Sequence, residues 1–455
     1  MKNYYIKNRI HKRDLCHIRF VKSIFAFAIA VVLLCNAAVV SNHNTFYVSA
    51  AKKSTGSKNM TGTVKVKSKK GREMTEKEKG ALSGSSFKLL SSVTSKSEGK
   101  NVLISPTSIM YAFGMAENGA KGKTRSQLES VVNGGIKTGD FNKILAYSRN
   151  RMNKNKNVKW NIANSVWYRK NKNVKVKKPF LKNVKSYYGA EVYRAPFNSK
   201  TVKDVNSWVK KNTRKMIPKI LGQTNKSDVM YLINAVAFEG KWAEQFTDRQ
   251  ILEKQDFTNY DKTVSKVTML SGKESSYFEL NGARGFKKSY VGGEYSFVGI
   301  EMPEGTTAEQ YLKNLSENGG DFVNALNNMK HANVIIKFPE FKSEYNVELS
   351  NVLKGLGATN AFDPDKANLY NMFEKDPDSN YCFSAVLHRT YIEVDDKGTK
   401  AAAATAIVVN KVTSVIAHDI ETIEITLDHP FVYAIVDNTN NLPVFIGMEN
   451  VISEE

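Results

Sequence analysis

A segment near the C-terminus, residues 401–410, contains neither a charged residue nor a proline. Its four consecutive alanines favour a helix, whereas the β-branched residues 407–409 favour a strand. An apolar, β-prone segment is an aggregation hazard when exposed, so soluble proteins usually bury it or interrupt it. Gly398 ahead of the alanines and the β-branched residues behind them disfavour a helix. These residues alone indicate a static buried strand, with a segment that changes its position as the alternative.

The chain can form one large domain or two or three ordinary ones, since it has 455 residues, of which 41% are hydrophobic. Helical patterning dominates early, as in "NVLISPTSIMYAFGMAENGA", which contains a Ser-Pro helix start. Strand patterns dominate later, in "YLINAVAFEG", "YSFVGIEMP", "NVIIKFPEF" and "PFVYAIVD". Helices followed by strands, without regular alternation, predict a mixed α+β domain.

The first fifty residues have the pattern of an export signal. Basic residues between Lys2 and Lys22 precede an uncharged apolar run at residues 24–40, and small residues offer a cleavage site after Ala50. A single membrane anchor is the alternative, because the run is close to the length that spans a bilayer. We therefore expect residues 1–50 to be an export signal and the protein to be secreted or tethered to the cell surface.

Residues 51–80 are strongly basic and lack aromatic side chains, in a chain whose formal net charge is +23. This composition predicts a flexible basic tether or, equally, a solvated spacer without a partner. From residue 81 to residue 455 the sequence has the character of one globular domain. After the leader only Cys382 remains, so the mature chain can form no internal disulfide.

Signals for a metal site, a cofactor or catalysis are weak. The seven histidines form no His-x-x-x-His pair, and there is no cysteine cluster. Glycine-rich loops of the phosphate-binding kind are missing, as is the Gly-x-Ser-x-Gly elbow of a hydrolase. We expect no metal, no cofactor and no enzyme activity. An unrelated secreted hydrolase is a less favoured alternative.

Five segments between residues 85 and 452 carry a family resemblance: "NVLISPTSIMYAFGMAENGAKGKTRSQLESVV", "VNSWVKKNTRKMIPKIL", "LINAVAFEGKWAEQF", "IIKFPEFKSEYNVELSNVLKGLGATNAF" and "LDHPFVYAIVDNTNNLPVFIGMENV". In this order they resemble the helix-B segment, the helix-F segment, the central strand of the large sheet, a later strand–helix block and the C-terminal signature of serpins. The chain resembles the inhibitory type, as in a secreted bacterial-like member. The resemblance implies one monomeric α+β domain with three β-sheets, about nine helices and an exposed reactive-centre loop.

The resemblance also implies a suicide-type inhibitor of serine proteases. In this family the protease attacks the reactive loop and forms an acyl-enzyme, after which the cut loop enters the large sheet as a new strand. Loop insertion in serpins is itself a standard example of strand addition to a sheet and of the release of stored strain. A non-inhibitory serpin that acts as a binding module is the alternative. No nucleic acid is expected as a partner.

The charge-free segment matches the hinge of that loop. Small residues follow the hinge glycine in inhibitory serpins, and the corresponding residues here are Gly398, Thr399, Lys400, Ala401, Ala402, Ala403, Ala404 and Thr405. In an inserted strand, alternate side chains face opposite sides of the sheet. The set that includes Thr399, Ala401, Ala403 and Thr405 is uncharged and can pass under the sheet, whereas Lys400 belongs to the set that faces water.

The family's usual cut falls fourteen residues after the hinge glycine, which places the reactive bond between Val412 and Thr413. A small aliphatic residue before the bond favours an elastase-like protease. Lys411 is the runner-up and would suit a trypsin-like protease. A papain-like cysteine protease is a further candidate target of this loop.

Other positions carry over from the family to a polar cluster where the sheet opens, with a tryptophan above it: Ser105, Ser108, Asn234, His388 and Trp242. Two departures stand out. Lys400 replaces the usual Glu, on the outward face. Glu340 replaces a Lys that in some relatives pairs with an acid near the hinge, so repulsion from Asp396 is expected unless Lys337 or Lys342 substitutes.

Positive charge is concentrated in residues 149–178, in "SRNRMNKNKNVKW" and "RKNKNVKVKK". Some serpins bind sulfated polysaccharides near this region, so a polyanion is a candidate partner. A solvated basic surface is the favoured interpretation.

Overall fold

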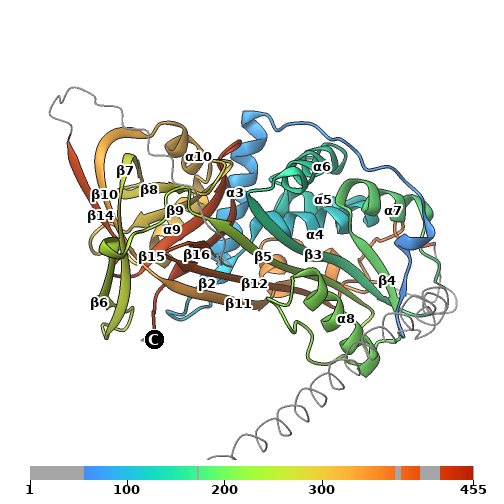
Figure 1. The fold of residues 1–455 in the computed structure, drawn as a ribbon. Helices are drawn as coiled ribbons and strands as arrows, with labels where there is room; N and C mark the ends of the chain where they lie inside the picture. The colour runs from blue at the N-terminus through green and yellow to red at the C-terminus, as the bar shows by residue number, and fades with distance from the viewer. Residues whose placement is uncertain (1–55, 172–173, 375–380, 400–420, 454–455) are drawn as a thin grey trace, which may run out of the picture. The chain divides into compact units, whose positions relative to one another are not determined.

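The computed structural model describes residues 56–171, 174–374, 381–399 and 421–453. They form a mixed α+β domain with nine α-helices, α3 to α11, among these residues, which confirms the predicted fold class (Figure 1). The predicted export signal and the predicted reactive bond lie outside the described residues.

A seven-stranded sheet contains the opening that the resemblance implies. Its order is β1-β4-β3-β5-β13-β12-β11. The strands span Lys58–Asn59 (β1), Glu191–Ala195 (β4), Val158–Arg169 (β3), Met230–Lys241 (β5), Gly398–Thr399 (β13), Ala385–Asp395 (β12) and Phe341–Glu348 (β11). The central strands β5 and β12 are parallel, and the pairs β3–β5 and β11–β12 are antiparallel.

A second sheet has nine strands among the described residues. Eight follow the order β14-β10-β7-β8-β9-β15-β16-β2, and β6 pairs with β7. Their bounds are Thr422–Thr426 (β14), Lys330–Pro339 (β10), Val264–Leu280 (β7), Ala283–Ser289 (β8), Tyr295–Glu301 (β9), Phe431–Asp437 (β15), Leu442–Glu449 (β16), Val102–Ile104 (β2) and Ile251–Thr258 (β6). The long strand β7 pairs with β6, β10 and β8 in turn, so two of the three expected sheets are joined into one hydrogen-bonded network.

Helices cover both faces of the seven-stranded sheet (Figure 1). They span Glu76–Thr94 (α3), Pro106–Gly119 (α4), Gly122–Val132 (α5), Thr138–Lys154 (α6), Lys178–Asn183 (α7), Ser199–Asn212 (α8), Ala308–Glu317 (α9), Gly320–Asn327 (α10) and Ser350–Gly355 (α11). Val205 and Val209 of α8 pack in one core cluster with Ile233 and Ala235 of β5. Leu232, with its side chain on the opposite face, belongs to the large cluster that contains α4.

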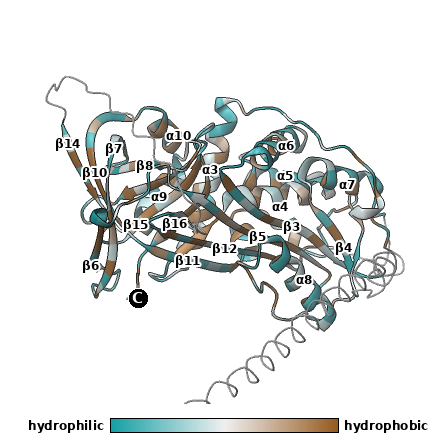
Figure 2. Ribbon diagram, viewed as in Figure 1, coloured by the Kyte–Doolittle hydropathy of each residue, from teal (hydrophilic) through white to brown (hydrophobic). Residues whose placement is uncertain are grey.

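The helix α4 begins where the sequence places its start signal. Ser105 is the N-cap, its hydroxyl accepts a hydrogen bond from the Ser108 amide, and Pro106 occupies the first helical position. Almost all α4 residues are buried, which explains their apolar character. Figure 2 shows hydrophobic colour along the central strands and hydrophilic colour on the outer helix α6. In the part of the chain that is described, no helix is both long and apolar enough to cross a membrane.

The predicted flexible tether differs from the structure from Gly56 onward. Strand β1 pairs with the edge strand β4, and the side chain of Val64 is buried. The Lys185 ammonium group donates hydrogen bonds to the carbonyl oxygens of Thr61 and Val64. Because these contacts are made by the backbone, a basic composition without aromatic residues did not reveal them. We call residues 56–75 the N-terminal strap.

Candidate functional site

The candidate site is the place where β5 and β12 separate. The two strands pair in parallel from Tyr231 and Ala385 to Ala237 and Tyr391. Beyond these pairs, β13 lies between them and is antiparallel to both. Thr399 pairs with Gly240 on one side and with Val394 on the other. The first two residues of the predicted hinge therefore already occupy the end of the gap between the central strands.

Glycine is required at the start of β13. Gly398 has φ +152°, and a Cβ built on it would lie 2.1 Å from the carbonyl oxygen of Gly240. Any other residue would collide with the backbone of β5 at this distance. The next side chain, Thr399, is fully buried, and its hydroxyl lies 2.6 Å from the Tyr290 hydroxyl. Burial raises the pKa of Tyr290, so this phenol is neutral.

Trp242 covers the end of the gap. Its ring stacks on Tyr290 with centroids 4.7 Å apart and an interplanar angle of 9°. The indole N–H donates to the carbonyl oxygen of Asp395 at 2.8 Å, and the Trp242 amide donates to the carbonyl oxygen of Lys397 at 3.0 Å. These bonds attach the turn between β12 and β13 to the end of β5.

The structure brings Ser105, Ser108, Asn234 and His388 together beneath the paired part of β5 and β12. The Asn234 amide donates to the Ser108 hydroxyl at 2.5 Å, and its side-chain oxygen contacts His388 Nδ1. His388 Nε2 accepts from the Ser105 amide at 3.1 Å. The sequence interpretation missed one member, Asn164 of β3, whose side-chain oxygen accepts from the Asn234 amide. Nothing local in the sequence distinguishes Asn164 from other strand residues.

His388 is held in its neutral form. It is fully buried, and burial lowers its pKa to about 3. Because Nε2 accepts a hydrogen bond, Nδ1 carries the proton and donates to Asn234. Both ring nitrogens are therefore engaged, which fits a structural hydrogen bond between the two central strands and does not fit a catalytic base.

The expected repulsion between Glu340 and Asp396 takes a different form. Glu340 Oε1 accepts a hydrogen bond of 2.9 Å from the backbone amide of Asp396. The Glu340 carboxylate thus binds the turn between β12 and β13 through the backbone of Asp396. The sequence indicated only two like charges at these positions. Of the two predicted substitutes, Lys337 pairs with Glu424, and Lys342 pairs with Glu393.

The predicted basic region at residues 149–178 does not form one continuous segment on the surface. Its two halves, residues 149–157 and 170–178, flank β3, whose 12 residues form an extended strand. At the usual rise of a strand, the two ends of β3 lie about 35 Å apart. Arg149 in the first half contacts Ser186, eight residues after the second half, so the halves come closer than the strand ends. Polyanion binding stays a prediction. The remaining hinge residues, Lys400 to Thr405, lie outside the described residues, as do Lys411, Val412 and Thr413.

Fold and site together define a class of protein whose central sheet holds a short strand between the ends of two parallel strands. A family model described as Serpin (serine protease inhibitor) matches residues 81–451. The chain belongs to this family, as the sequence resemblance predicted.

Solved structures and sequence relatives agree with this assignment. The native state of tengpin, a thermophilic serpin, has a TM-score of 0.79 and 36% identity, and the match covers 87% of this chain and 100% of tengpin. Serpin B6 of Macaca fascicularis is 30% identical over 367 residues, 77% of this chain and 93% of that protein. Serpin-ZX of Arabidopsis thaliana is 27% identical over 383 residues, 78% of this chain and 93% of that protein.

Proposed function

We propose that this protein is an exported suicide-type inhibitor that traps a serine protease by inserting its cleaved loop between β5 and β12. The observation that carries the proposal is β13, which is already paired antiparallel to both strands at one end of the gap. Membership of a family of serine protease inhibitors supports the same function.

The register of β13 supports the insertion of further residues. Thr399 pairs with Gly240 and Val394, so an uninterrupted strand would bring Thr405 opposite both Asn234 and His388. Asn234 and His388 are direct partners in the β5–β12 pairing, so the extrapolations along the two strands agree. Directly opposed residues share a face of the sheet. Since Val394 and His388 are buried, Thr399 and Thr405 would both lie under the sheet, as the alternation in the sequence predicts.

Strand exchange provides a driving force. Insertion would replace one parallel pairing, β5–β12, by two antiparallel pairings, and antiparallel pairs are slightly more stable per residue. It would also bury the apolar segment at residues 401–410, which is hazardous when exposed. The gap between β5 and β12 can thus accommodate the loop segment, and strand pairing and burial would favour its insertion.

The covalent step of trapping joins the protease to the loop. The protease serine Oγ attacks the carbonyl carbon of Val412, the bond to Thr413 breaks, and the Thr413 amine leaves with the proton that the protease's own base supplies. The product is an ester between the protease and Val412. We propose an elastase-like target on the basis of Val412, with a trypsin-like target if the cut follows Lys411.

The decisive experiment incubates the protein with elastase and, separately, with trypsin, followed by a denaturing gel and mass spectrometry of the released peptide. We expect a covalent complex that survives boiling and a C-terminal peptide that begins at Thr413. Loop cleavage without a complex would replace the proposal by the non-inhibitory alternative. A peptide that begins at Val412 would assign the cut to Lys411 and a trypsin-like target.

Export is the second part of the proposal. Basic residues followed by the apolar run at residues 24–40 support secretion or attachment to the cell surface. Fractionation of the producing cells with N-terminal sequencing tests it. A mature chain that begins at Ala51 indicates cleavage, and an intact N-terminus in the membrane fraction indicates an anchor.

A further inference from the structure

The N-terminal strap, residues 56–75, carries a row of exposed lysines. Four of them lie close together in the sequence: Lys65, Lys67, Lys69 and Lys70. Val64 has extended backbone angles and is buried, and Val66 is half-buried. Because alternate side chains of an extended segment point to opposite sides, the two valines face the domain while Lys65 and Lys67 face the solvent.

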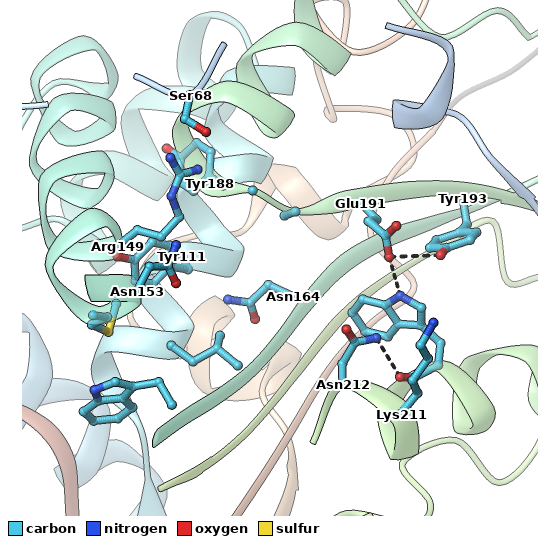
Figure 3. Close-up of a pocket in the computed structure, with 16 residues that line it drawn as sticks. Ser68, Tyr111, Arg149, Asn153, Asn164, Tyr188, Glu191, Tyr193, Lys211 and Asn212 are labelled. Carbon is cyan, nitrogen blue, oxygen red and sulfur yellow. Dashed lines mark hydrogen bonds between the residues drawn. The ribbon is translucent and has the colours of Figure 1, made fainter. Parts of the chain in front are cut away.

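The strap is held in place through its backbone. The Lys69 amide donates a hydrogen bond to the carbonyl oxygen of Ser186 at 2.9 Å. The Asn150 side-chain amide donates to the carbonyl oxygens of Lys69 and Lys70 at 2.8 and 3.0 Å. Ser68, between the lysines, lines a pocket of the domain together with Arg149 (Figure 3). Since these contacts leave the lysine side chains outside and fix the segment beneath them, a partner would not have to order the strap.

The four lysines keep their positive charge uncompensated. Among the residues that the structure describes, none of the four has an ion-pair partner. Carboxylates bind the strap at its two ends instead. At one end Asp204 accepts a hydrogen bond from the strap backbone at 3.1 Å, and Glu191 accepts one from Asn59 at 2.6 Å. At the other end Glu78 pairs with Arg72. The middle of the strap is therefore a positive surface.

The sequence places this surface close to an apolar run. No acidic residue occurs between Asp14 and Glu73, and residues 41–72 contain eight lysines and arginines. Residues 41–55 separate the apolar run at residues 24–40 from Gly56. A chain of this length can hold its ends at most about 50 Å apart. A polybasic segment next to a run that can span a bilayer is typical of proteins that bind anionic lipid headgroups.

The strap lies at the end of the domain away from β14. Figure 1 shows it in blue, passing α7 and α6, with β14 on the opposite side. Its contacts agree with this view, because Asn150 belongs to α6 and Lys185 lies directly after α7. β14 is the first described strand after the predicted reactive loop. A molecule that docked through the strap would therefore leave the side of β14 accessible to other proteins.

We propose that the N-terminal strap docks on an anionic lipid membrane through its four lysines, and that the docked molecule presents the side of β14 to the solution. Charge complementarity and the apolar run that precedes the strap favour a lipid surface as the partner. Docking itself does not depend on protease trapping. The benefit of this orientation for inhibition rests on the proposed function.

The binding test measures cosedimentation of the chain that begins at Ala51 with vesicles of equimolar phosphatidylcholine and phosphatidylglycerol. Vesicles of phosphatidylcholine alone are the control. We expect binding to the anionic vesicles only, and we expect about 0.5 M salt to abolish it, because salt screens exposed charges. Equal binding to both kinds of vesicle, or no binding to the anionic vesicles at low salt, would overturn the proposal.

Two variants with the same loss of charge locate the docking surface. The strap variant carries Lys65→Gln, Lys67→Gln, Lys69→Gln and Lys70→Gln. The control variant has the same substitution at four exposed lysines of α3, the turn after it, β7 and α9: Lys88, Lys96, Lys273 and Lys313.

The strap variant should bind anionic vesicles on the order of a hundredfold more weakly than the parent, since each lysine near such a surface contributes about fivefold in affinity. The control variant should lose severalfold at most. Both variants should keep the Tm of the parent, because backbone groups hold the strap. Equal losses in the two variants would show an attraction to net charge alone and overturn the site.

A sulfated polysaccharide is the competing partner for a basic segment. Retention of the parent and of the strap variant on a dextran sulfate column separates the two partners. If the strap lysines determine retention on the column while the parent does not bind anionic vesicles, the strap binds a polyanionic polymer and the membrane proposal is wrong.

The orientation is measured separately, as the rate of covalent complex formation by vesicle-bound and by free protein. We expect similar rates, because the docked molecule leaves the side of β14 accessible. A much lower rate on the vesicles would overturn the orientation. If no protease is trapped under any condition, the proposed function fails, while the vesicle binding of the strap variant still decides the docking surface.

Discussion

At the scale of single residues, Thr399 is the position on which the proposed loop insertion depends. Its side chain is fully buried and its hydroxyl meets the neutral phenol of Tyr290. The backbone before it approaches β5 so closely that Gly398 cannot carry a side chain. Gly398 and Thr399, the first two residues of the predicted hinge, therefore each have a backbone or side-chain environment that constrains the residue type.

If the proposed mechanism holds, Thr399→Arg should convert the protein from an inhibitor into a substrate of the protease. The arginine would have to enter an apolar layer beneath the sheet, which costs several kcal/mol without a partner. Insertion competes with hydrolysis of the acyl-enzyme, so even a modest delay changes the outcome. We expect the variant to fold and to be cut near Val412 but to release active protease, as measured by the ratio of complex to cleaved protein. Thr399→Ser is the matched control, and equal trapping by both variants would show that the assigned register is wrong.

Glu449 makes the stability of the fold depend on pH. It is fully buried, accepts a hydrogen bond from the Tyr433 hydroxyl at 3.1 Å, and burial raises its pKa from 4.5 to about 8. A folded pKa above the unfolded one gives stability that is complete below pH 4.5 and is lost as the pH rises toward 8. Glu449→Gln should flatten this decline in the free energy of unfolding by a few kcal/mol at most. The buried Glu117, with a similar shift, should keep a residual slope.

Urea unfolding of the parent protein and of Glu449→Gln, between about pH 4.5 and about pH 8.5, measures how the free energy of unfolding of each depends on pH. The exposed Glu317 provides the control, because Glu317→Gln should leave the slope of the parent protein unchanged. A slope that is identical in Glu449→Gln and in the parent would mean that the buried carboxyl group does not titrate in this range.

Residue patterns and family resemblance predicted much of the site. The alternation in the sequence placed Thr399 on the buried face, and the resemblance named the four residues that the structure joins through hydrogen bonds. Asn164 could not be predicted in this way. Its partner Asn234 lies on a strand far away in the chain, and no local spacing indicates such a contact.

At the scale of secondary-structure elements, the gap at the end of β5 and β12 has a charge pattern of its own. In the register of β13, the residue after Thr399 would lie opposite Glu239 of β5 and Glu393 of β12. Both carboxylates are on the outer face, where Lys159 and Lys342 are their present ion-pair partners. The position that follows Thr399 is Lys400, so the departure from the family's usual Glu has a complementary environment.

Lys400→Glu should therefore impair trapping, because the inserted strand would place a third carboxylate next to two others. Each exposed ion pair contributes about 1 kcal/mol or less to stability. We therefore expect the ratio of covalent complex to cleaved protein to fall severalfold, without a complete loss of trapping. Lys400→Gln should have a smaller effect, and about 1 M salt should bring the two variants closer together. If Lys400→Glu traps as well as the parent at low salt, the residue after Thr399 does not lie between these carboxylates.

Composition was the weaker guide to the arrangement of elements. It predicted a tether where the N-terminal strap packs against β4 and α6, and it gave no sign that β3 lies between the two halves of the basic region. Composition reports how a segment is solvated. Main-chain pairing and the length of a strand depend on the order of the residues in the sequence. The strand and helix patterns, which use this order, therefore predicted the elements better than composition did.

At the scale of the whole molecule, the proposed mechanism requires an intact protein that is less stable than its cleaved form. Full insertion would add on the order of ten antiparallel hydrogen bonds in all along the two sides of the new strand. Cleavage near Val412 should then raise the Tm by roughly 10 °C or more. Scanning calorimetry before and after a clean loop cut measures this, and an unchanged Tm would refute loop insertion.

The short pairing of β1 with β4 has a consequence for how separate molecules meet. An open sheet is exposed to unwanted pairing along the backbones of its two edge strands. Here β1 occupies part of the border next to β4, and the opposite border, β11, presents the charged residues Lys342, Glu344 and Glu348. Charges and a covering segment are the devices by which natural sheets discourage edge-to-edge assembly. A chain that lacks the N-terminal strap should therefore form oligomers at high concentration, even when each copy still folds.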